Sequence, residues 1–523
     1  MATEVGKPSG GAVESKGLKP GALGLVSATV VGVASAAPAY SLAAVLGFVV
    51  AAGVGFKSPA IMWISFIPMG CIAAAFFYLN RADPDCGTNF TWVTRAIGPR
   101  WGWMGGWSSA VADLLIMPNL AAIAAIYTLS LFGFDKQSSS IWWQLGLGCI
   151  FIMGMTWICV VGIELSARTQ LVLLGTELAI LVVFSVVCLI KVWTGHIHGS
   201  VSPSLSWLTP TNFGGTHALV EGMLLAVFIY WGWDTATSVN EECEEPNKVP
   251  GLAGILATVV LVLIYVLVAY AAQAAKGPSF LADPNNSGDV FAATGAVVFG
   301  TNGIGWWALK LLLLAVLSSS AASCQTTILP AARTALSMAM HRAAPQKFGE
   351  VHPEHLTPAW SSWLFGLISC AWFAILTIIT RYYGGNVLGW SITAVGLMIC
   401  YYYGQCGIAC VIYYRRYLFK SLKNFVFVGV LPLIGGLTLA YLFVKSLMDM
   451  SHADYTDPPK LWLGVNPVMV IGLGMLLLGL PLMFWWNTRD HAFFRVKPDP
   501  IDSRPPPEGG EPLPPLVAEG APK

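Results

Sequence analysis

Three acidic residues, Asp113, Glu177 and Asp234, stand inside long apolar stretches of this sequence. A carboxylate held away from water is costly, so a membrane protein retains one where it binds a proton, a cation or another polar group. Lys310 also falls in an apolar stretch, but close enough to one end for its side chain to reach the interface. The acids therefore indicate proton or cation chemistry inside a membrane.

The composition is that of a membrane protein. Of the 523 residues, 56% are apolar and 11% are charged, against roughly 25% charged residues in a soluble domain. The 28 Lys and Arg nearly cancel the 27 Asp and Glu, so the net charge of +1 creates no field for nucleic acid. These values exclude a soluble enzyme, a coiled coil, a nucleic-acid-binding module and a disulfide-stapled secreted domain.

The sequence contains no nucleophile–base pair, phosphate-binding loop or metal-ligand spacing. We therefore expect a protein that is not an enzyme and that has no cofactor and no resident metal. Its expected partners are the lipid bilayer, a small molecule and a coupling ion.

Twelve segments are long and apolar enough to cross a bilayer, which takes about 20 residues of helix. Lipid offers no partner for open strands, so the sequence predicts an all-α polytopic membrane protein with twelve transmembrane helices. The expected spans are Leu23–Ala52, Pro59–Asn80, Trp101–Phe132, Ile141–Val161, Leu171–Trp193, Leu219–Glu241, Leu252–Ala275, Ile304–Ala331, Trp360–Ile379, Leu388–Tyr413, Val426–Leu447 and Pro467–Trp486.

The basic residues predict the orientation. Twelve spans leave both ends of the chain on one side, and most of the 28 Lys and Arg then fall on that side. The positive-inside rule makes this side cytoplasmic, in a plasma (inner) membrane. Residues 1–20, rich in Gly, Ser and Lys, and the Pro-rich residues 491–523 are predicted to be disordered cytoplasmic tails.

Two of the expected spans carry helix-breaking residues near their centres. The first contains the run Ala34, Ser35, Ala36, Ala37 and Pro38, and the proline removes a backbone donor and clashes with the preceding turn. The sixth contains Gly232, a weak helix former, followed by Asp234 as a candidate N-cap. Interrupted helices at matched places in two halves of a chain are typical of a transporter site at the membrane midplane.

Several motifs carry a resemblance to a known family. They are Asn80-Arg81-Ala82-Asp83-Pro84-Asp85-Cys86-Gly87, Trp101-Gly102-Trp103, Gly162-Ile163-Glu164-Leu165-Ser166-Ala167-Arg168, Glu241-Glu242 with Pro246 and Pro250, Ala332-Arg333, His352-Pro353 and Thr357-Pro358. Across residues 21–490 the sequence resembles the amino acid–polyamine–organocation (APC) permease superfamily, of the bacterial amino acid permease type.

The resemblance implies an inverted repeat of five plus five helices with two extra C-terminal helices. The first repeat would span residues 21–200, the second residues 201–420, and the extra helices residues 421–490. It also implies proton- or sodium-coupled transport, or exchange, of amino acids or amines. Where the family has a Gly-Ser-Gly break, this chain has Ala34-Ser35-Ala36, which leaves less room around a substrate carboxylate. A polyamine or amino alcohol therefore stays open as the substrate.

Glu177 is the expected proton-coupling residue. In some proton-coupled members of the family that this sequence resembles, the position matching Glu177 holds a lysine, which takes the place of a sodium ion. In this chain a carboxylate occupies that position. Burial favours the neutral form of a carboxyl group, so Glu177 could load and release a proton near neutral pH. The alternative is a structural hydrogen bond to Ser319, Ser320 or Ser323 of the eighth span, and these serines keep sodium coupling open.

The expected substrate site combines both interrupted helices with the third span. Asp234 either caps the second half of the sixth helix or pairs with a substrate ammonium. Asp113 and Asn119 on the third span either face the site or bond a neighbouring helix. Mid-span aromatic rings suit an ammonium, and the resemblance implies that one of them gates the site, with Phe228 favoured over Tyr230, Trp231 and Trp233.

The acidic cluster Glu241, Glu242, Glu244 and Glu245 either closes an inner gate through Arg95 or Arg168 or is a solvated loop. Together these features predict a secondary transporter for an amino acid or related amine that works by alternating access and is coupled to protons. A membrane nutrient sensor that binds without transporting is the rival interpretation.

Overall fold

The computed structural model describes residues 16–385, 387–452, 455, 461–498 and 516. The predicted tails, residues 1–20 and 491–523, fall largely outside these ranges. The described chain is nearly all helix, and its only extended pairings are the isolated bridges Leu23–Cys243 and Trp462–Val465. Ten helices within the described residues are long and apolar enough to span a membrane. The prediction of an all-α polytopic membrane protein is confirmed.

The first spanning range, Leu25–Ala82, contains α1 (Leu25–Ser35), α2 (Pro38–Val49), η1 (Val50–Val54), η2 (Gly55–Lys57) and α3 (Ser58–Ala82). The other long helices are α5 (Pro99–Leu131), α7 (Ile141–Val161), α8 (Ile163–Trp193), α11 (Val249–Lys276), α14 (Ile304–Met340), α15 (Ala359–Tyr383), α16 (Val387–Tyr413), α18 (Leu431–Met450) and α19 (Pro467–Arg489).

Shorter helices connect and cap the long ones. They are α4 (Asn89–Ala96), α6 (Asp135–Ser138), η3 (Leu205–Leu208), α9 (Thr216–Ile229), α10 (Thr235–Ser238), η4 (Asn240–Glu242), α12 (Pro278–Leu281), α13 (Val290–Phe299), η5 (Gln346–Gly349), η6 (Leu418–Lys420), α17 (Leu422–Asn424), η7 (Phe425–Val430) and η9 (Phe493–Arg495).

Two differences from the sequence-based boundaries matter for function. The expected sixth span is divided between α9, which has 14 residues, and the single turn α10. The expected eighth span ends at Ala331, whereas α14 continues to Met340 and so carries Arg333 within a helix. Because the range Leu25–Ala82 joins two expected spans and α9 is short, the count of twelve crossings and the inverted repeat stay predictions.

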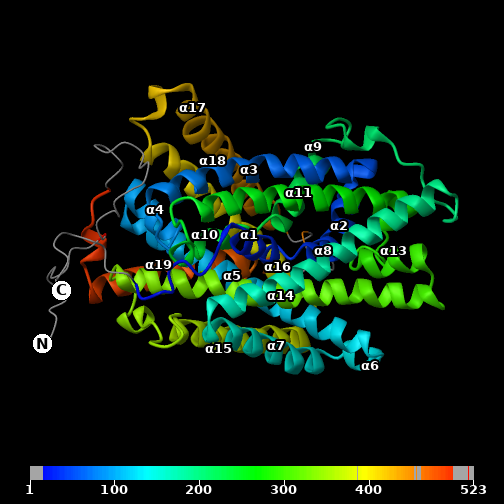
Figure 1. Cartoon of the computed structure of the whole chain (residues 1–523), viewed down its shortest axis with the longest axis horizontal. Coiled ribbons are helices and arrows are strands. Elements are labelled where there is room, and N and C mark those ends of the chain that lie inside the picture. Colours follow the sequence, from blue (N-terminus) through cyan, green and yellow to red (C-terminus); the bar gives the residue numbers. More distant parts are fainter. Residues whose placement is uncertain (1–15, 386, 453–454, 456–460, 499–515, 517–523) are drawn as a thin grey trace, which may run out of the picture.

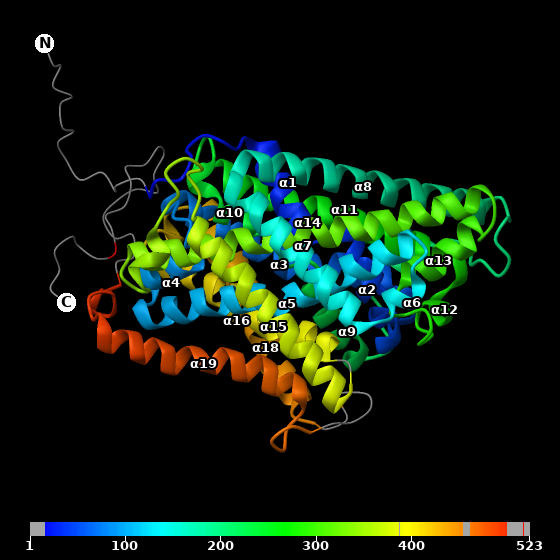
Figure 2. The ribbon, with the colours of Figure 1, turned by 90° about the horizontal axis from the view of Figure 1, so that it is seen from below.

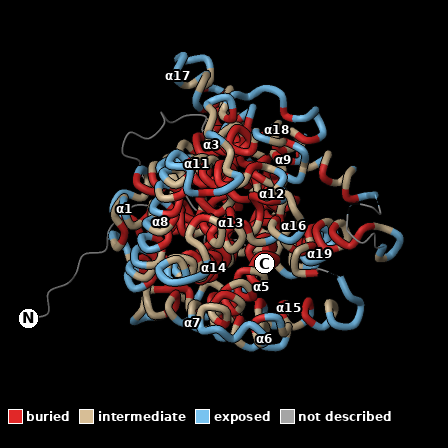
Figure 3. Tube along the Cα trace, turned by 90° about the vertical axis from the view of Figure 1, so that its right-hand side faces the viewer, coloured by how far each residue is buried: buried red, intermediate tan, exposed pale blue. Residues whose placement is uncertain are grey.

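The long helices run side by side along one axis of the molecule (Figure 1, Figure 2). Helices α2 and α10 consist mostly of buried residues, while α8, α15 and α19 lie at the edge of the bundle. Figure 3 shows the buried residues gathered around the centre and the exposed residues around the rim. The exposed face of α8 includes Leu171, Val172, Val183 and Ile190. An aliphatic outer surface of this kind matches lipid rather than water.

Both ends of the described chain meet at one end of the bundle (Figure 1). Lys16 binds Asp85 in the loop after α3, and Asp490, which follows α19, binds Arg342 after α14. At this end the chain is therefore held by contacts between segments that are far apart in the sequence. We call it the terminal end.

Candidate functional site

The first helix breaks at the predicted place. Helix α1 ends at Ser35 and α2 begins at Pro38, and between them Ala37 adopts a left-handed conformation with φ 47° and ψ 64°. Pro38 is the first residue of α2, a position where a helix needs no N–H donor. The break leaves backbone groups on both sides without partners inside the helix.

Side chains from α8 and α14 bind these backbone groups. The Ala39 N–H donates to Glu177 Oε1 at 2.6 Å, and the Tyr40 N–H donates to Ser319 Oγ at 3.1 Å. On the other side of the break, the Ser323 hydroxyl donates to the Ser35 carbonyl at 3.0 Å. Helices α8 and α14 therefore hold the break in the first helix open.

The break in the sixth helix lies directly against the first. Gly232 has φ +112°, and a Cβ placed on it would lie 2.7 Å from the carbonyl carbon of Ser35. The hydroxyl groups of Ser35 and Thr235 are 2.9 Å apart. A glycine is required here both by the backbone conformation and by the close approach of the two chains.

Glu177 is buried and only one of its oxygens is bonded. The Ser319 hydroxyl donates to Oε1 at 2.8 Å, so that oxygen accepts from both Ser319 and the Ala39 N–H. Oε2 has no hydrogen-bond partner among the described residues. Ser320 instead donates to the Val316 carbonyl of its own helix. Of the three predicted serines, Ser319 and Ser323 thus touch the break and Ser320 does not.

Asp234 stands at the N-cap position of α10, but its side chain makes no capping hydrogen bond, so that interpretation was wrong. Its φ of −69° and ψ of −15° are helical rather than extended, which turns the carboxylate away from the following N–H groups. The carboxylate instead accepts from the hydroxyls of Tyr403 at 2.7 Å and Tyr402 at 3.0 Å. Trp231 Nε1 extends this chain by donating to the Tyr402 hydroxyl at 2.5 Å.

The third-span residues divide between two neighbours. Asp113 is buried on α5 close enough to Asp234 and Tyr402 for an electrostatic interaction, and its Oδ2 has no partner within the described chain. Asn119, farther along α5, accepts a hydrogen bond from the Tyr40 hydroxyl. Asp113 thus lies near the group formed by Asp234 and Tyr402, while Asn119 binds the first helix just beyond its break.

A small cavity of about 20 Å³ opens at the two breaks. It has room for roughly one water molecule, so a larger guest enters only if the walls move. Its lining residues are Ser35, Ala36, Ala37, Tyr40, Ser41, Ile116, Leu120, Phe228, Trp231 and Ser323. The other residues predicted for the substrate site do not line it: Ala34, Pro38, Tyr230, Gly232, Asp234, Asp113 and Asn119.

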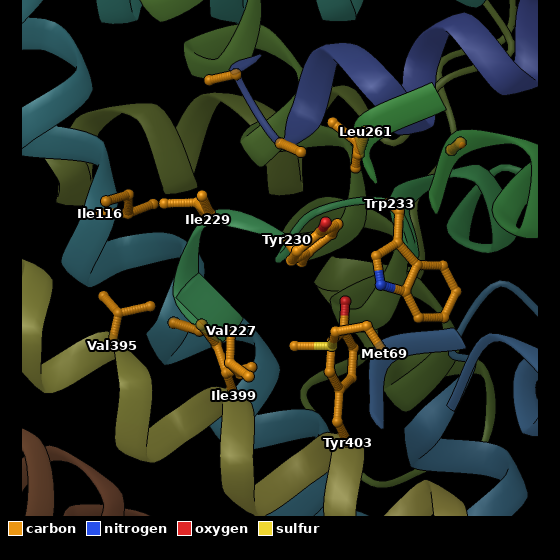
Figure 4. Packing of buried hydrophobic residues seen from close by; sticks show 14 of the residues in the cluster. Met69, Ile116, Val227, Ile229, Tyr230, Trp233, Leu261, Val395, Ile399 and Tyr403 are labelled. Carbon is orange, nitrogen blue, oxygen red and sulfur yellow. The ribbon is translucent and has the colours of Figure 1, made fainter. Parts of the chain in front are cut away.

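Tyr230 points away from this cavity, because its hydroxyl donates to the Met62 carbonyl on α3 at 2.9 Å. Figure 4 shows Val227 and Ile229 of α9 lying toward Ile116 of α5 and toward α16, with Tyr230 and Trp233 beyond them. Trp233 is fully buried. Of the four aromatic gate candidates, Phe228 and Trp231 therefore lie on the cavity.

Buried ion pairs join distant segments of the chain at the terminal end. Arg333 of α14 donates from Nε and Nη2 to both oxygens of Glu242, at 2.6 and 2.8 Å, and both side chains are buried. Arg95 instead pairs with Asp83. The sequence-based pairing of the acidic cluster with Arg95 or Arg168 was wrong, because α14 is longer than expected and carries Arg333 to Glu242.

A second ion-pair cluster forms around Lys16. Its ammonium lies 2.7 Å from Asp85 Oδ2 and 2.6 Å from Glu241 Oε1, and His341 Nε2 lies 3.0 Å from Asp85. Burial alone would raise the pKa of Asp85, but the Lys16 charge and the His341 hydrogen bond hold it well below its usual range. Burial likewise opposes the charge of Lys16, yet Asp85 and Glu241 raise its pKa well above the usual value. The Lys16 ammonium occupies the space between these acids.

A family model described as amino acid permease matches residues 23–474. The chain belongs to this family. A permease is a membrane transport protein, so this chain is a membrane transporter.

The permease is similar to several curated transporters. It is 25% identical over 389 residues to a low-affinity putrescine importer of Escherichia coli (strain K12), covering 71% of this chain and 77% of the relative. It is 22% identical over 437 residues to Asc-type amino acid transporter 1 of Mus musculus, covering 80% and 72%. An uncharacterized transporter of Mycobacterium tuberculosis (strain ATCC 25618 / H37Rv) is 24% identical over 353 residues, covering 67% and 72%.

The permease also resembles a solved structure, that of MhsT in complex with L-phenylalanine. The TM-score is 0.58 at 13% sequence identity, and the match covers 80% of this chain and 98% of the other. At this identity the likeness concerns the fold alone.

Sequence reasoning missed several residues around the site of the permease. Tyr402 and Tyr403 bind Asp234, Tyr40 lines the cavity, and Arg333 pairs with Glu242. The run Tyr401-Tyr402-Tyr403 in the middle of an apolar stretch was an available signal, because three adjacent hydroxyls inside a membrane need polar partners.

Proposed function

We propose that this permease is a proton-coupled secondary transporter for an amino acid or related amine, working by alternating access. The observation that carries the proposal is the contact of Glu177 with the break in the first helix. One carboxylate oxygen accepts two hydrogen bonds there, and the other is buried without a partner in the described chain. The carboxyl group is thus joined to the helix break, whose residues Ala37 and Tyr40 on either side of Ala39 line the cavity.

Protonation of Glu177 would change that backbone directly. The ionised carboxylate lies at the N-terminus of α2, where the helix dipole favours a negative charge. A proton would remove this charge and would turn the carboxyl group, at present an acceptor for two donors, into a group that can also donate. Loading a proton therefore favours a rearrangement around Ala39 and Ser319, and with it a change at the cavity.

The cavity walls suit a small cationic guest. Phe228 and Trp231 offer ring faces for an ammonium, and Trp231 is joined through the Tyr402 hydroxyl to the Asp234 carboxylate. Ala36 and Ala37, which line the cavity, leave less room for a carboxylate than glycines would, which keeps polyamines and amino alcohols as substrates beside amino acids. The similar putrescine importer and amino acid transporter support both classes.

Alternating access would require the terminal end to open and close. In the proposal this end faces the cytoplasm of a plasma membrane. The Arg333–Glu242 pair and the Lys16 cluster keep it closed here, and they would separate in the inward-open state. Sodium coupling is the weaker alternative, because Ser319 already donates its hydroxyl to Glu177.

The test starts with ligand binding. Amino acids, amino alcohols and diamines are screened by thermal shift on the purified full chain, since a ligand of the folded state raises the melting temperature. The compounds that shift it are then offered to proteoliposomes under a proton gradient or a sodium gradient. We expect uptake under the proton gradient alone. Binding without uptake under either gradient would contradict transport and favour a sensor, and uptake only under sodium would contradict proton coupling.

A further inference from the structure

Two cysteines on neighbouring helices contact each other at the edge of the bundle. All eleven cysteines of the chain lie in its described part and nine of them are buried; the two that are partly exposed are Cys149 of α7 and Cys370 of α15. Cys370 Sγ lies 4.0 Å from the Cys149 carbonyl oxygen, and the two side chains interact directly with each other. The transport proposal does not use this pair. We propose that an organic hydroperoxide dissolved in the membrane oxidises Cys149 and Cys370 to a disulfide.

Close packing of α7 against α15 holds the two thiols opposite each other. On one side of the pair, a Cβ placed on Gly148 would lie 2.6 Å from the ring of Phe373. On the other side, a Cβ placed on Gly366 would lie 2.5 Å from Thr156 Oγ1. Residue numbers rise along α7 as they fall along α15, so the two helices run antiparallel and a glycine contact flanks the cysteines in each direction. Small residues let helices approach closely in lipid, and the thiols therefore meet at a tight crossing.

The pair is placed to meet lipid rather than water. Cys149 is the ninth of the 21 residues of α7, and Cys370 is the twelfth of the 25 residues of α15. At 1.5 Å per residue, each thiol is at least about 12 Å from either end of its helix. Figure 1 shows α7 and α15 along one edge of the bundle, and Ile150 and Leu367 near the pair are 67% and 55% exposed. An oxidant that dissolves in lipid therefore reaches this pair more readily than one that stays in water.

The reaction balances with the hydroperoxide as the oxidant. One thiol attacks the hydroperoxide oxygen that carries the hydrogen, the O–O bond breaks, an alcohol leaves with the thiol proton, and the cysteine becomes a sulfenic acid. The second thiol attacks the sulfenic sulfur, an S–S bond forms, and the hydroxyl group leaves as water with the second thiol proton. The two thiols together lose two electrons and two protons, and the hydroperoxide takes them up. The neighbouring thiol thus directs the oxidation to a disulfide.

A disulfide here would fasten α7 to α15 beside a wall of the transport cavity. A Cβ on Gly148 would also lie 3.1 Å from the Ala121 carbonyl oxygen of α5, and Leu120, the preceding residue, lines that cavity. A cross-link between Cys149 and Cys370 would close a long loop, which lowers the entropy of the unfolded chain. We therefore expect the oxidised chain to melt at a higher temperature than the reduced chain.

The experiment treats the full chain in saturated phosphatidylcholine liposomes with cumene hydroperoxide, which partitions into lipid, or with hydrogen peroxide, which stays largely in water. Free thiols are then blocked with N-ethylmaleimide, and mass spectrometry of the digested chain detects linked peptides. The variants are Cys149→Ser and Cys370→Ser. Cys188→Ser is the matched control, because Cys188 is buried and its thiol donates to the Ala271 carbonyl. Melting temperatures recorded before oxidation exclude misfolding.

We expect cumene hydroperoxide to link Cys149 to Cys370 in the unaltered chain and in Cys188→Ser. The linked peptides should lack two hydrogen masses, and a reducing thiol should reverse both the link and the rise in melting temperature. In Cys370→Ser the remaining Cys149 should stop at a sulfenic acid, which dimedone traps, and Cys149→Ser should give no link.

Two results would overturn the proposal: both thiols remaining free after treatment, or a link from either cysteine to a different one. An equal yield of the link with hydrogen peroxide would overturn the route through the membrane. None of these outcomes depends on whether the chain transports an amine.

Discussion

The polar network at the helix break and the ion pairs at the terminal end are both buried, yet they differ in how their charges are balanced. Among the described residues, Glu177 accepts hydrogen bonds at one oxygen from a backbone N–H and a hydroxyl, both neutral donors. Glu242 is bound by Arg333 through both oxygens, and Lys16 is bound by Asp85 and Glu241.

This difference indicates two different roles for the buried carboxylates. A carboxylate balanced only by neutral donors can gain a proton without breaking an ion pair. A carboxylate paired with a guanidinium keeps its charge and holds two segments together. Under the proposed function, the helix break would switch with proton binding and the ion pairs would hold the terminal end closed.

The largest effect is expected at the Arg333–Glu242 pair. Glu242→Gln leaves a buried guanidinium without its counter-charge and should lower the free energy of unfolding by about 3–5 kcal/mol. Chemical denaturation of the purified chain measures this change. Glu245→Gln is the control, because Glu245 is exposed and its partner Lys248 is 3.5 Å away, so its loss should have no measurable effect. Equal effects of the two substitutions would contradict closure by Glu242.

A smaller loss is expected where the two breaks touch. Gly232→Ala places a Cβ against the Ser35 carbonyl and forces alanine to a φ of +112°. We expect about 2 kcal/mol less stability, together with weaker ligand binding in the thermal-shift screen. Gly154→Ala on α7 is the control, because a Cβ at Gly154 meets nothing within 4 Å. Unchanged stability and binding in Gly232→Ala would mean that the breaks are not in close contact.

Next comes the Lys16 cluster. Lys16→Gln should cost about 1–2 kcal/mol, since Glu241 is partly exposed and water can replace part of the lost interaction. The control is Lys19→Gln, three residues farther along the chain. Lys19 forms an exposed ion pair with Glu164, so its removal should not change the free energy of unfolding measurably. The same denaturation experiment distinguishes the two, and similar effects would argue against a closing role for Lys16.

The contribution of Lys16 to the free energy of unfolding should not change with pH in the physiological range. Because the pKa of Asp85 is lowered in the folded chain, its contribution to stability is complete at pH values above about 4, the ordinary pKa of an aspartate. This stability is lost as the pH falls toward the folded pKa. Because the pKa of Lys16 is raised in the folded chain, its contribution to stability is complete at pH values below about 10, the ordinary pKa of a lysine. This stability is lost as the pH rises through the folded pKa. The stability difference between Lys16→Gln and the unaltered chain should thus be the same at pH 5.5 and pH 8, and a clear change between them would contradict this account.

Local signals in the sequence predicted the fold and the breaks. Apolar runs marked the helices, and Pro38 and Gly232 marked the interruptions, because each residue acts on the backbone at its own position. The contact between Glu177 and Ser319 was one of the stated alternatives, since the resemblance brought their helices together.

Contacts between residues far apart in the sequence could not be predicted from such local signals. Arg333 reaches Glu242 only because α14 continues beyond Ala331, and the hydroxyls of Tyr402 and Tyr403 compete for the carboxylate that was expected to cap α10. Which partner a buried charge takes depends on helix length and rotation, and one sequence does not contain these quantities explicitly.

The most direct test of the switching role is Glu177→Gln in proteoliposomes, with Glu221→Gln at an exposed carboxylate as control. The glutamine keeps an acceptor for the Ala39 N–H but cannot exchange a proton. The account predicts that the variant still exchanges internal for external substrate but no longer accumulates it under a proton gradient. Accumulation equal to that of the unaltered chain would contradict it.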